Sequence, residues 1–332
     1  MIRRALASLL RVALAFAVFV LGLWLAITRP IWTGSGEHLA GSAVDQQRLR
    51  QIVEQLSTDW APRDYASVEH TEAVAIFIEQ QLSLYSAEVE SQRFRVDGQP
   101  YRNLIASFGP DSEQVYVVGA HYDAVSTTPG ADDNASGVAG LLELARLLAG
   151  QPLKHRVLLA SYALEEPPHF PGPDMGSHVH ARSLAGREVK LMISLEMIGY
   201  FSDEPGSQLY PNPVLAWFYP SRGNFITVVE QFSGNSAYAV KAAINRHTDL
   251  PAYSVNAPDL IEEIGFSDHR NFWLHGYPAV MVTDTAFMRN LQYHDAGDTA
   301  DRLDYVAMSE VVYGVYRYLL EVAAAPERSA PR

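Results

Sequence analysis

Six residues spread along the sequence are of the types that bind divalent metal ions. In chain order they are His121, Asp133, Glu165, Glu166, Glu196 and His294. His121 follows the apolar run VYVVGA, and Asp123 comes two residues later, so a carboxylate is available to orient a metal-binding imidazole ring. A histidine at the end of a strand is more often an ordinary turn residue, because loops collect polar side chains. The ordered series of histidines and acids is therefore more informative than any single member.

The acidic residues of this series favour a metal site for electrostatic reasons. Glu165 and Glu166 are adjacent after the run RVLLASYA, and neighbouring carboxylates repel each other unless cations or solvent compensate. With a metal bound, one of the two can be a ligand while the other acts as a general base. Glu196 lies within the run LMISLEM, where a buried carboxylate is unfavourable unless it is paired or bound to metal.

Asp133 lies in the segment GADDNASG, which opens an amphipathic stretch over residues 134–148. As an ordinary helix start, this segment would use Asn134 as the N-cap, and the helix dipole would favour the acids. As a functional site, it would hold a carboxylate that bridges two cations. The two interpretations are compatible, because capping fixes the backbone that aims the side chain.

The elements that would position these residues alternate between strands and helices. Strands are predicted at residues 93–96, 103–108, 115–120, 156–163, 191–197 and 279–283. Helices are predicted at residues 45–57, 70–85, 134–148, 225–232, 237–245 and 305–323, with a long loop at 200–224. This alternation predicts a single α/β domain with a mixed, mainly parallel β-sheet flanked by helices. In such a sheet, ligands bind at the carboxyl ends of the strands.

Composition limits the kinds of ligand and partner. The 332 residues include no cysteine, which excludes disulfides, zinc fingers and thiol catalysis, so a metal ion must be held by histidines and carboxylates. Lys and Arg total 25 against 38 Asp and Glu, giving a net charge of −13. Nucleic-acid binding requires clustered basic residues, and the sequence has no such cluster, so no nucleic-acid partner is expected.

The N-terminal region has the pattern of a membrane-spanning helix. Arg3, Arg4 and Arg11 precede an uninterrupted apolar run over residues 12–27. As a helix this run spans ~24 Å, slightly less than the ~30 Å hydrocarbon core of a bilayer. Three arginines precede the run and one, Arg29, directly follows it, so the positive-inside rule places the N-terminus in the cytoplasm.

Trp24 and Trp32 fall where an interfacial aromatic belt would lie, which supports an uncleaved anchor in the lipid bilayer. A cleaved signal peptide is the alternative, but no small-x-small site lies close behind the apolar run. The predicted organisation is an anchor at 1–32, a linker at 33–44, a catalytic domain at 45–325 and a tail at 326–332. The expected location is the inner (cytoplasmic) membrane, with a single span and the catalytic domain facing the periplasm or the outside.

Three parts of the sequence resemble the zinc aminopeptidases of the M28 peptidase family, which are co-catalytic metallopeptidases. They are the segment GADD-x-ASG, the Glu165-Glu166 pair, and the Tyr293-His294 pair ahead of Asp298 and Thr299. The resemblance covers residues 104–305 and implies the zinc-peptidase fold and two Zn²⁺ per chain.

Matched position by position, the resemblance implies two zinc sites that share a ligand. One zinc is expected on His121, Asp133 and Glu196. The other is expected on Asp133, Glu166 and His294, so that Asp133 bridges the two ions.

The same resemblance implies further catalytic roles. Glu165 matches the general base, Asp123 matches the carboxylate that orients the first histidine, and Tyr293 matches a tyrosine that stabilises the oxyanion in some members. Glu196 stands where several members have aspartate, and both are oxygen donors. Asn134 replaces an aspartate found in some members at a position that is not a ligand.

The function expected from this resemblance is a zinc-dependent aminopeptidase, an exopeptidase that hydrolyses the N-terminal peptide bond of peptide substrates. A metal-activated bridging water would attack, and Glu165 would act as the base. The alternatives are a single-zinc aminoacyltransferase similar to glutaminyl cyclases, a carboxypeptidase or another amide hydrolase, and an inert ectodomain that binds peptides.

Other polar and aromatic residues have weaker indications. Asp268 and His269 are candidate substrate contacts, although capping of a helix is the more common role for such an aspartate. His178 and His180 fall on a predicted helix two residues apart and do not share a face, so they are expected to be solvated. Residues 217–219 either line an apolar pocket or pack their own loop.

Overall fold

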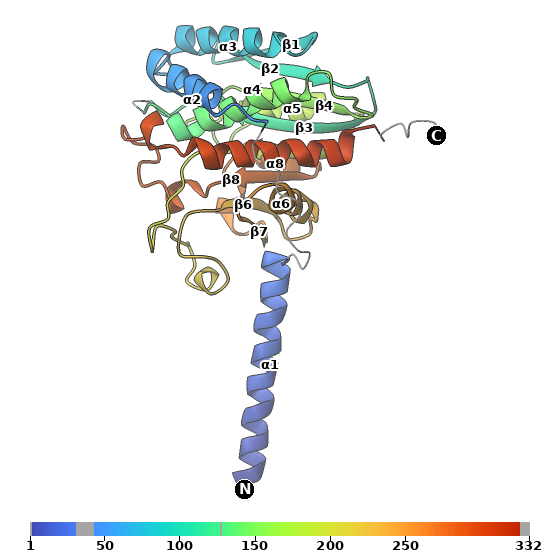
Figure 1. The fold of residues 1–332 in the computed structure, drawn as a ribbon, viewed down its shortest axis with the longest axis vertical. Helices are drawn as coiled ribbons and strands as arrows, with labels where there is room; N and C mark the ends of the chain where they lie inside the picture. Colours follow the sequence, from blue (N-terminus) through green and yellow to red (C-terminus); the bar gives the residue numbers. More distant parts are fainter. Residues whose placement is uncertain (1, 31–42, 127, 326–332) are drawn as a thin grey trace.

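The computed structural model describes residues 2–30, 43–126 and 128–325. Most of the predicted linker and all of the predicted tail lie outside these residues. The chain forms an α/β body from which a single long helix, α1 (Ile2–Thr28), extends (Figure 1).

The centre of the body is one eight-stranded sheet with the strand order β1-β2-β4-β3-β5-β8-β6-β7. The strands are β1 (Glu88–Val96), β2 (Gln99–Phe108), β3 (Gln114–His121), β4 (Arg156–Tyr162), β5 (Glu188–Leu195), β6 (Ile226–Gln231), β7 (Ala252–Ala257) and β8 (Ala279–Thr283). The middle strands β4, β3, β5 and β8 run parallel, whereas β1, β2 and the β6–β7 pair join through antiparallel pairings. The mixed α/β fold predicted from the sequence is confirmed.

Helices cover both faces of this sheet. They are α2 (Gln46–Glu54), α3 (Val68–Ser83), α4 (Gly137–Leu148), α5 (Gly176–Ser183), α6 (Ser236–His247), α7 (His269–Leu274) and α8 (Tyr305–Ala323). One core contains apolar residues of α2, α3, α4, α6 and α8, and a second core contains those of α5 and α7. Residues of β3 alternate between them, because Val118 belongs to the first core and Val117 to the second.

The predicted helix at residues 225–232 is wrong, because this segment is strand β6. Its residues Ile226–Val229 are mostly β-branched, and they pair with β7 on one side and β8 on the other. Strand β7 was not predicted. The helix predicted from residue 134 becomes regular only at Gly137, since Asp133 and Asn134 have non-helical backbone angles.

Helix α1 contains the one described segment that is long and apolar enough to cross a membrane, Ser8–Thr28. The segment is 21 residues long, and an 18-residue window within it has a mean hydropathy of 2.4. A signal sequence near the N-terminus meets the same criteria of length and composition, so these criteria alone do not distinguish a lasting anchor from a cleaved leader.

Candidate metal centre

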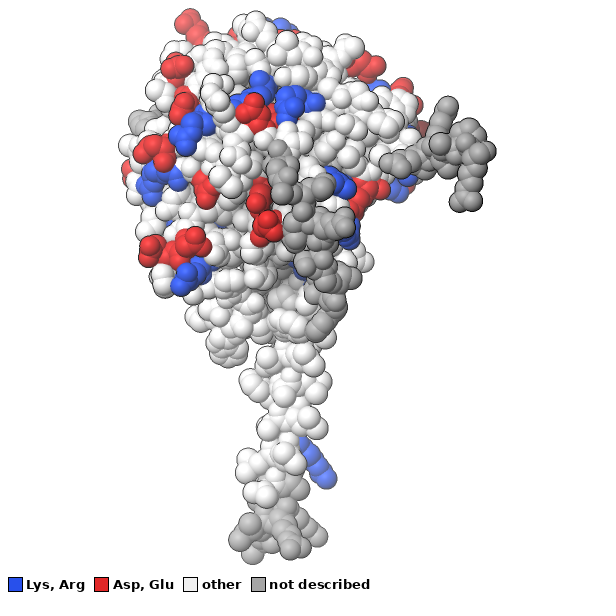
Figure 2. All heavy atoms as spheres, viewed as in Figure 1, with Lys and Arg blue, Asp and Glu red and all other residues white. Residues whose placement is uncertain are grey.

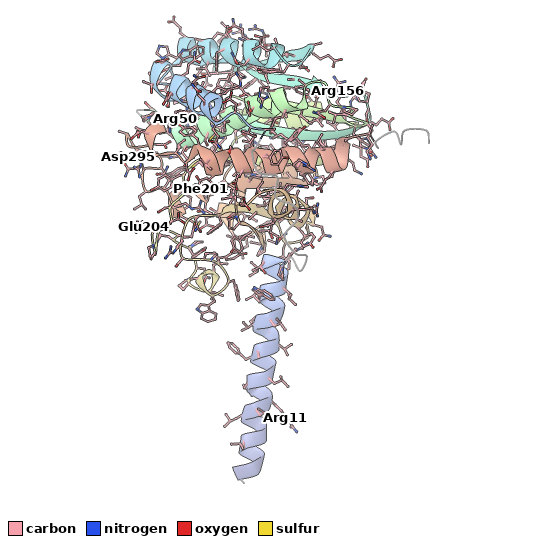
Figure 3. The ribbon with its side chains drawn as sticks, viewed as in Figure 1. Arg11, Arg50, Arg156, Phe201, Glu204 and Asp295 are labelled. Carbon is pink, nitrogen blue, oxygen red and sulfur yellow. The ribbon has the colours of Figure 1, made fainter. Side chains whose placement is uncertain are left out.

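The predicted ligands lie at one edge of the sheet because the carboxyl ends of its parallel strands lie together there. His121 is the last residue of β3, Glu196 directly follows β5, and Glu165 and Glu166 follow β4 after two residues. Strand β4 begins at Arg156 on the right of Figure 3, and the loop labelled at Asp295, which follows His294, lies on the left. The candidate site therefore lies at the left edge of the sheet in this view.

The structure brings the five predicted ligands into two groups that share Asp133. Nε2 of His121 lies 3.5 Å from Oδ1 of Asp133 and 3.3 Å from Oε2 of Glu196. Nε2 of His294 lies 3.2 Å from Oδ2 of Asp133 and 3.3 Å from Oε2 of Glu166. Asp133 thus offers one carboxylate oxygen to each group, as a bridging ligand would.

The donor atoms of these groups fit zinc in type and spacing. Two donors on one tetrahedral zinc, each at about 2.0–2.1 Å from the ion, lie about 3.3–3.4 Å apart. The four separations range from 3.2 to 3.5 Å. Among the described residues, the buried Nε2 atoms of His121 and His294 have no hydrogen-bond partner. Unpartnered nitrogens at ligand spacing from carboxylates are the arrangement expected of a metal site.

The site concentrates negative charge that a cation would compensate. Its acidic side chains are all buried, and they are Asp123, Asp133, Glu165, Glu166 and Glu196. Burial, together with the charge of Asp133, raises the pKa of Glu166 to about 8. Burial lowers the pKa of His294, but the neighbouring carboxylates of Asp133 and Glu166 outweigh it and raise this pKa to about 10. At neutral pH without a metal ion Glu166 and His294 are therefore protonated, and a divalent cation would compensate the charge of the same carboxylates.

Asp123 connects the first histidine to the Glu165-Glu166 pair. Its Oδ1 lies 3.4 Å from Nδ1 of His121 and accepts a hydrogen bond from the backbone N–H of Glu165 at 3.1 Å. Its Oδ2 accepts from the backbone N–H of Glu166 at 3.0 Å. Nδ1 of His121 also lies 3.2 Å from the backbone carbonyl oxygen of Asp123. Asp123 therefore faces the imidazole with both its carbonyl and its carboxylate, and the carboxylate fixes the backbone of both glutamates.

Three supporting residues had no role assigned from the sequence. The Ser267 hydroxyl donates to Oε2 of Glu196 at 2.8 Å, and Asp298 accepts from the backbone N–H of Asp133 at 3.1 Å. Arg63 is 1% exposed and donates to backbone carbonyls on both sides of the site, including those of Tyr122 and Gly130. Ser267 directly precedes the singled-out Asp268, and Asp298 follows the Tyr293-His294 pair, but no sequence signal indicates Arg63.

The backbone at the site adopts conformations that are rare for residues with side chains. Leu164 before Glu165, Met197 after Glu196, and His294 itself have φ values of 63°, 52° and 57°. Such residues cluster at functional sites, where the surrounding structure maintains the strain. Each of the three is either a predicted ligand or the direct neighbour of a predicted ligand or of the predicted base.

Tyr293 lies against the second histidine. Its ring stacks on that of His294 with the centroids 3.7 Å apart. Burial raises the pKa of Tyr293, and the charges of Asp133 and Glu166 raise it further. The phenol is therefore protonated at neutral pH and available as a hydrogen-bond donor.

Asp268 and His269 are both buried at the start of α7. The His269 ring packs on Trp273, and its Nε2 lies 2.7 Å from the carbonyl oxygen of Ile264. Burial lowers the pKa of His269 to about 4, so the ring is neutral. Burial raises the pKa of Asp268 to about 7, and Glu196 contributes to the rise. The side chain of Asp268 does not cap the helix, and the role of both residues in substrate binding stays a prediction.

The prediction that His178 and His180 are both solvated is wrong for His180. This residue is 1% exposed, and its Nδ1 lies 2.9 Å from the hydroxyl of Tyr162. Helix α5 packs between β2 and α7 on the second face of the sheet, which buries one side of the helix. His178 is partly buried and lies against His275.

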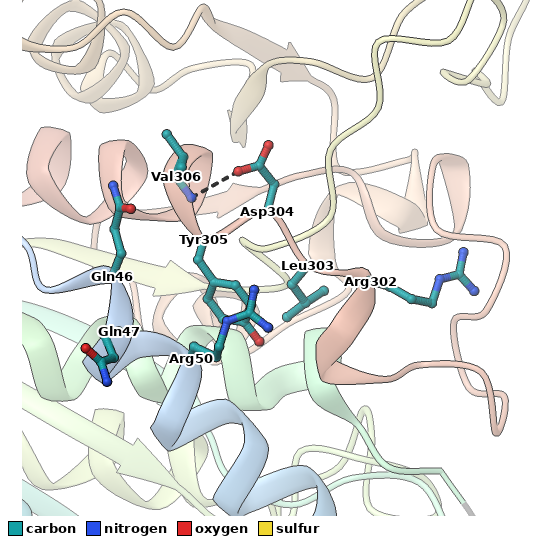
Figure 4. Close-up of a pocket in the computed structure, with 8 residues that line it drawn as sticks. All are labelled: Gln46, Gln47, Arg50, Arg302, Leu303, Asp304, Tyr305 and Val306. Atoms are coloured by element: carbon teal, nitrogen blue, oxygen red, sulfur yellow. Dashed lines mark hydrogen bonds between the residues drawn. The ribbon is translucent and has the colours of Figure 1, made fainter.

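A pocket of about 510 Å³ lies between the start of α2 and residues 302–306 (Figure 4). Arg50 projects over the ring of Tyr305, with its guanidinium 4.4 Å from the ring centroid. None of the residues lining this pocket belongs to the two ligand groups, so it is separate from the candidate metal centre.

The sequence and the fold are similar to those of known proteins. The sequence profile described as Peptidase family M28 matches residues 103–319. "Uncharacterized protein YfbL" of Escherichia coli (strain K12) is 49% identical over 282 residues, which cover 82% of this chain and 87% of that protein.

Two solved structures share the fold at low sequence identity. BSAP, a zinc aminopeptidase from Bacillus subtilis, has a TM-score of 0.69 at 14% identity, covering 87% of this chain and 98% of that chain. Glutaminyl cyclase from Porphyromonas gingivalis has a TM-score of 0.63 at 20% identity, covering 84% of this chain and 98% of that chain. At these identities the likeness shows the fold alone.

Proposed function

The chain belongs to peptidase family M28, and from this premise we propose that it is a zinc-dependent aminopeptidase that removes residues from the N-termini of peptides. The observation that carries the proposal is the pair of ligand groups that share Asp133. Two groups with one bridging carboxylate are the arrangement that two Zn²⁺ ions require, with His121 and Glu196 completing one site and Glu166 and His294 the other.

Zinc bound in these groups would polarise the scissile carbonyl and lower the pKa of a water molecule between the ions. Glu165 is the proposed general base. Its carboxylate is buried, and Oε2 lies 3.9 Å from Nε2 of His121, beside the first ligand group. Burial raises the pKa of Glu165, which suits a group that accepts a proton from water and then delivers it to the leaving amine.

Tyr293 is the proposed donor to the oxyanion. Its protonated phenol stands beside His294 and the surrounding carboxylates, where negative charge would develop on the carbonyl oxygen. Asp123 holds the backbone of Glu165, so that the base keeps its position relative to His121. We retain Asp268 and His269 as proposed residues of the substrate side of the site.

We also propose that α1 anchors the protein in the inner membrane. Three arginines precede the apolar part of the helix and one follows it, which favours a cytoplasmic N-terminus. The catalytic domain would then face the periplasm or the outside, where it would meet peptide substrates.

The test is the metal content of the full chain, purified in detergent without chelator and then titrated with zinc. We expect two tightly bound zinc ions and hydrolysis of aminoacyl anilides, which a chelator abolishes and zinc restores. One tight zinc that excess metal cannot supplement, with cyclisation of N-terminal glutamine, would instead support the cyclase alternative. A chain that binds peptides without tight zinc or turnover would support the inert ectodomain.

A further inference from the structure

The end of helix α1 is attached to the catalytic domain by a buried lysine. Lys241 of α6 is 3% exposed, and its ammonium donates to the backbone carbonyls of Thr28 and Arg29 at 2.7 and 2.6 Å. Its third hydrogen bond goes to the hydroxyl of Ser254 on β7 at 2.8 Å, and this hydroxyl also contacts the Thr28 carbonyl at 3.0 Å. The side chain of Arg29 in turn bonds the carbonyl of Phe232.

These contacts explain how a lysine can be buried in this domain. An ammonium group has three donors, and all three of Lys241 are used, two of them on carbonyls at the C-terminal end of α1. The C-terminal end of a helix is also where a cation is favourable. Loss of α1 would remove both of these acceptors together with residues that cover the ammonium. Lys241 therefore links the end of α1 directly to the domain.

The loop that carries Trp217 is attached to the same strand residue. The hydroxyl of Tyr219 donates to the backbone carbonyl of Ser254 at 2.7 Å, and its ring packs against Tyr210 and Tyr253. In Figure 1 this loop, drawn in yellow, lies on the side of the body from which α1 leaves. Ser254 therefore contacts both the loop, through its backbone carbonyl, and the end of α1, through its hydroxyl.

The loop exposes apolar side chains on this side. Trp217 is 68% exposed and Leu209 is 53% exposed, whereas Tyr219 between them and β7 is buried. In the view of Figure 2, charged side chains gather on the upper part of the body, and the part around the end of α1 carries few of them. A large exposed tryptophan beside an uncharged surface is typical of an interfacial membrane contact.

The length of the apolar run in α1 requires the body to lie close to the bilayer. The uninterrupted run over residues 12–27 is about 24 Å long at ~1.5 Å per residue, less than the ~30 Å hydrocarbon core that it must cross. The domain covers most residues from Leu23 to Thr28 at least in part, so the domain surface lies beside the last part of this run. The covered turns must therefore lie at membrane depth, and the domain surface beside them must reach the headgroups.

We propose that α1 and the loop over residues 209–219 form one membrane-seating surface, with Trp217 inserted among the lipid headgroups and Lys241 holding the domain in a fixed orientation on the bilayer. The inference rests on the proposed membrane anchor. It predicts that the edge of the sheet carrying the metal ligands faces along the membrane surface, above the inserted loop (Figure 1).

The test uses the absence of cysteine, which allows a single label in the full chain. The variant W217C is reconstituted into lipid vesicles and labelled with a fluorophore, and quenching by lipids that carry a nitroxide at the headgroup is measured. L84C is the control, because Leu84 is 66% exposed at the end of α3, on the far side of the body from α1. We expect loss of most of the emission at position 217 and little loss at position 84. Equal, weak quenching at both positions would overturn the proposal, and L209C provides a second label on the same loop.

The role of Lys241 is tested by K241M in the W217C background. The apolar part of α1 is unchanged, so the chain should resist extraction from membranes at alkaline pH, while quenching at position 217 decreases because the domain is no longer held. Unchanged quenching would refute the role of Lys241. A W217C chain that is extracted at alkaline pH would refute the anchor itself, whereas a chain that is retained but not quenched would refute only the seating surface. Zinc content and hydrolysis in detergent are measured separately and test the proposed activity alone.

Discussion

Asp298 holds the backbone of Asp133, the residue that offers an oxygen to each histidine of the site. Oδ2 of Asp298 accepts from the N–H of Asp133 at 3.1 Å, and both of its oxygens accept from the N–H of Asp132 at 3.0 and 3.2 Å. Asp298 itself is 1% exposed. Because one backbone position aims the oxygens shared by both ligand groups, Asp298 influences both at once.

Replacing Asp298 by asparagine should weaken zinc binding without removing a ligand. The amide nitrogen is a donor and cannot accept from the backbone N–H groups, so Asp133 would lose part of its support. We expect zinc affinity to fall by about 10–100-fold, as is usual for residues that orient metal ligands. Titration against a competing chelator measures this. D301N, at an exposed position of the following turn, is the matched control, and equal affinities in the two variants would contradict the prediction.

The variant E165Q separates the proposed base from the ligands. The glutamine side chain has nearly the same shape but cannot accept a proton, so zinc should bind as in the unaltered chain while turnover falls by about 10²–10⁴-fold. Metal analysis and steady-state kinetics on the same preparation measure both effects. E204Q, in an exposed loop, is the control, and turnover near normal in E165Q would show that another group is the base.

The variant E196A should remove one zinc site and leave the other. Glu196 belongs to the group with His121, whereas the group of Glu166 and His294 keeps all its side chains. We expect one tightly bound zinc per chain. S267A should have a weaker effect in the same direction, because it removes only the hydrogen bond to Oε2 of Glu196. Two tight zinc ions in E196A would contradict the assignment of this ligand.

Buried His180 should make the protein sensitive to acid. Burial lowers the pKa of its imidazole in the folded chain to about 3, from the ordinary histidine value of 6.5. Between these values the unfolded chain binds the extra proton, so the stabilisation is complete above pH 6.5 and is lost as the pH falls toward 3. At ~1.4 kcal/mol per pKa unit, lowering the pH from about 7 to about 5 should destabilise the protein by about 2 kcal/mol through this residue.

Chemical unfolding of H180Q and the unaltered chain at pH 7 and pH 5 tests this contribution. The variant is expected to be less stable at pH 7, because Tyr162 loses its ring partner, but to lose less stability on acidification. H70Q changes an exposed histidine and should keep the full pH dependence. Equal losses on acidification in H180Q and H70Q would show that His180 does not titrate on unfolding.

Local patterns were enough to predict the candidate ligands and most of the sheet. His121 and Glu165 come after apolar runs and Glu196 lies near the end of one, and such runs in parallel strands end at one edge, so these residues are expected to meet. The long apolar helix α1 was also predictable, since about twenty consecutive apolar residues are typical of a membrane-spanning helix.

Features that depend on pairing between distant segments were not predictable in this way. Residues 225–232 have apolar residues that suit either a helix or a strand, and only their neighbours β7 and β8 make them a strand. His180 is buried because α5 packs on the sheet, which a helical pattern alone does not specify.

The sequence by itself thus determined the chemistry available, because residue types and strand ends are local properties. The tertiary structure decided which other side chains fix the positions of the candidate ligands and of α1. Ser267, Asp298 and Arg63 act on residues far from them in the chain, and Lys241 reaches Thr28 across 213 positions. Hydrogen bonds of this kind form only where the folded backbone brings a donor close to an acceptor. The periodic patterns of a sequence do not predict which distant residues come that close.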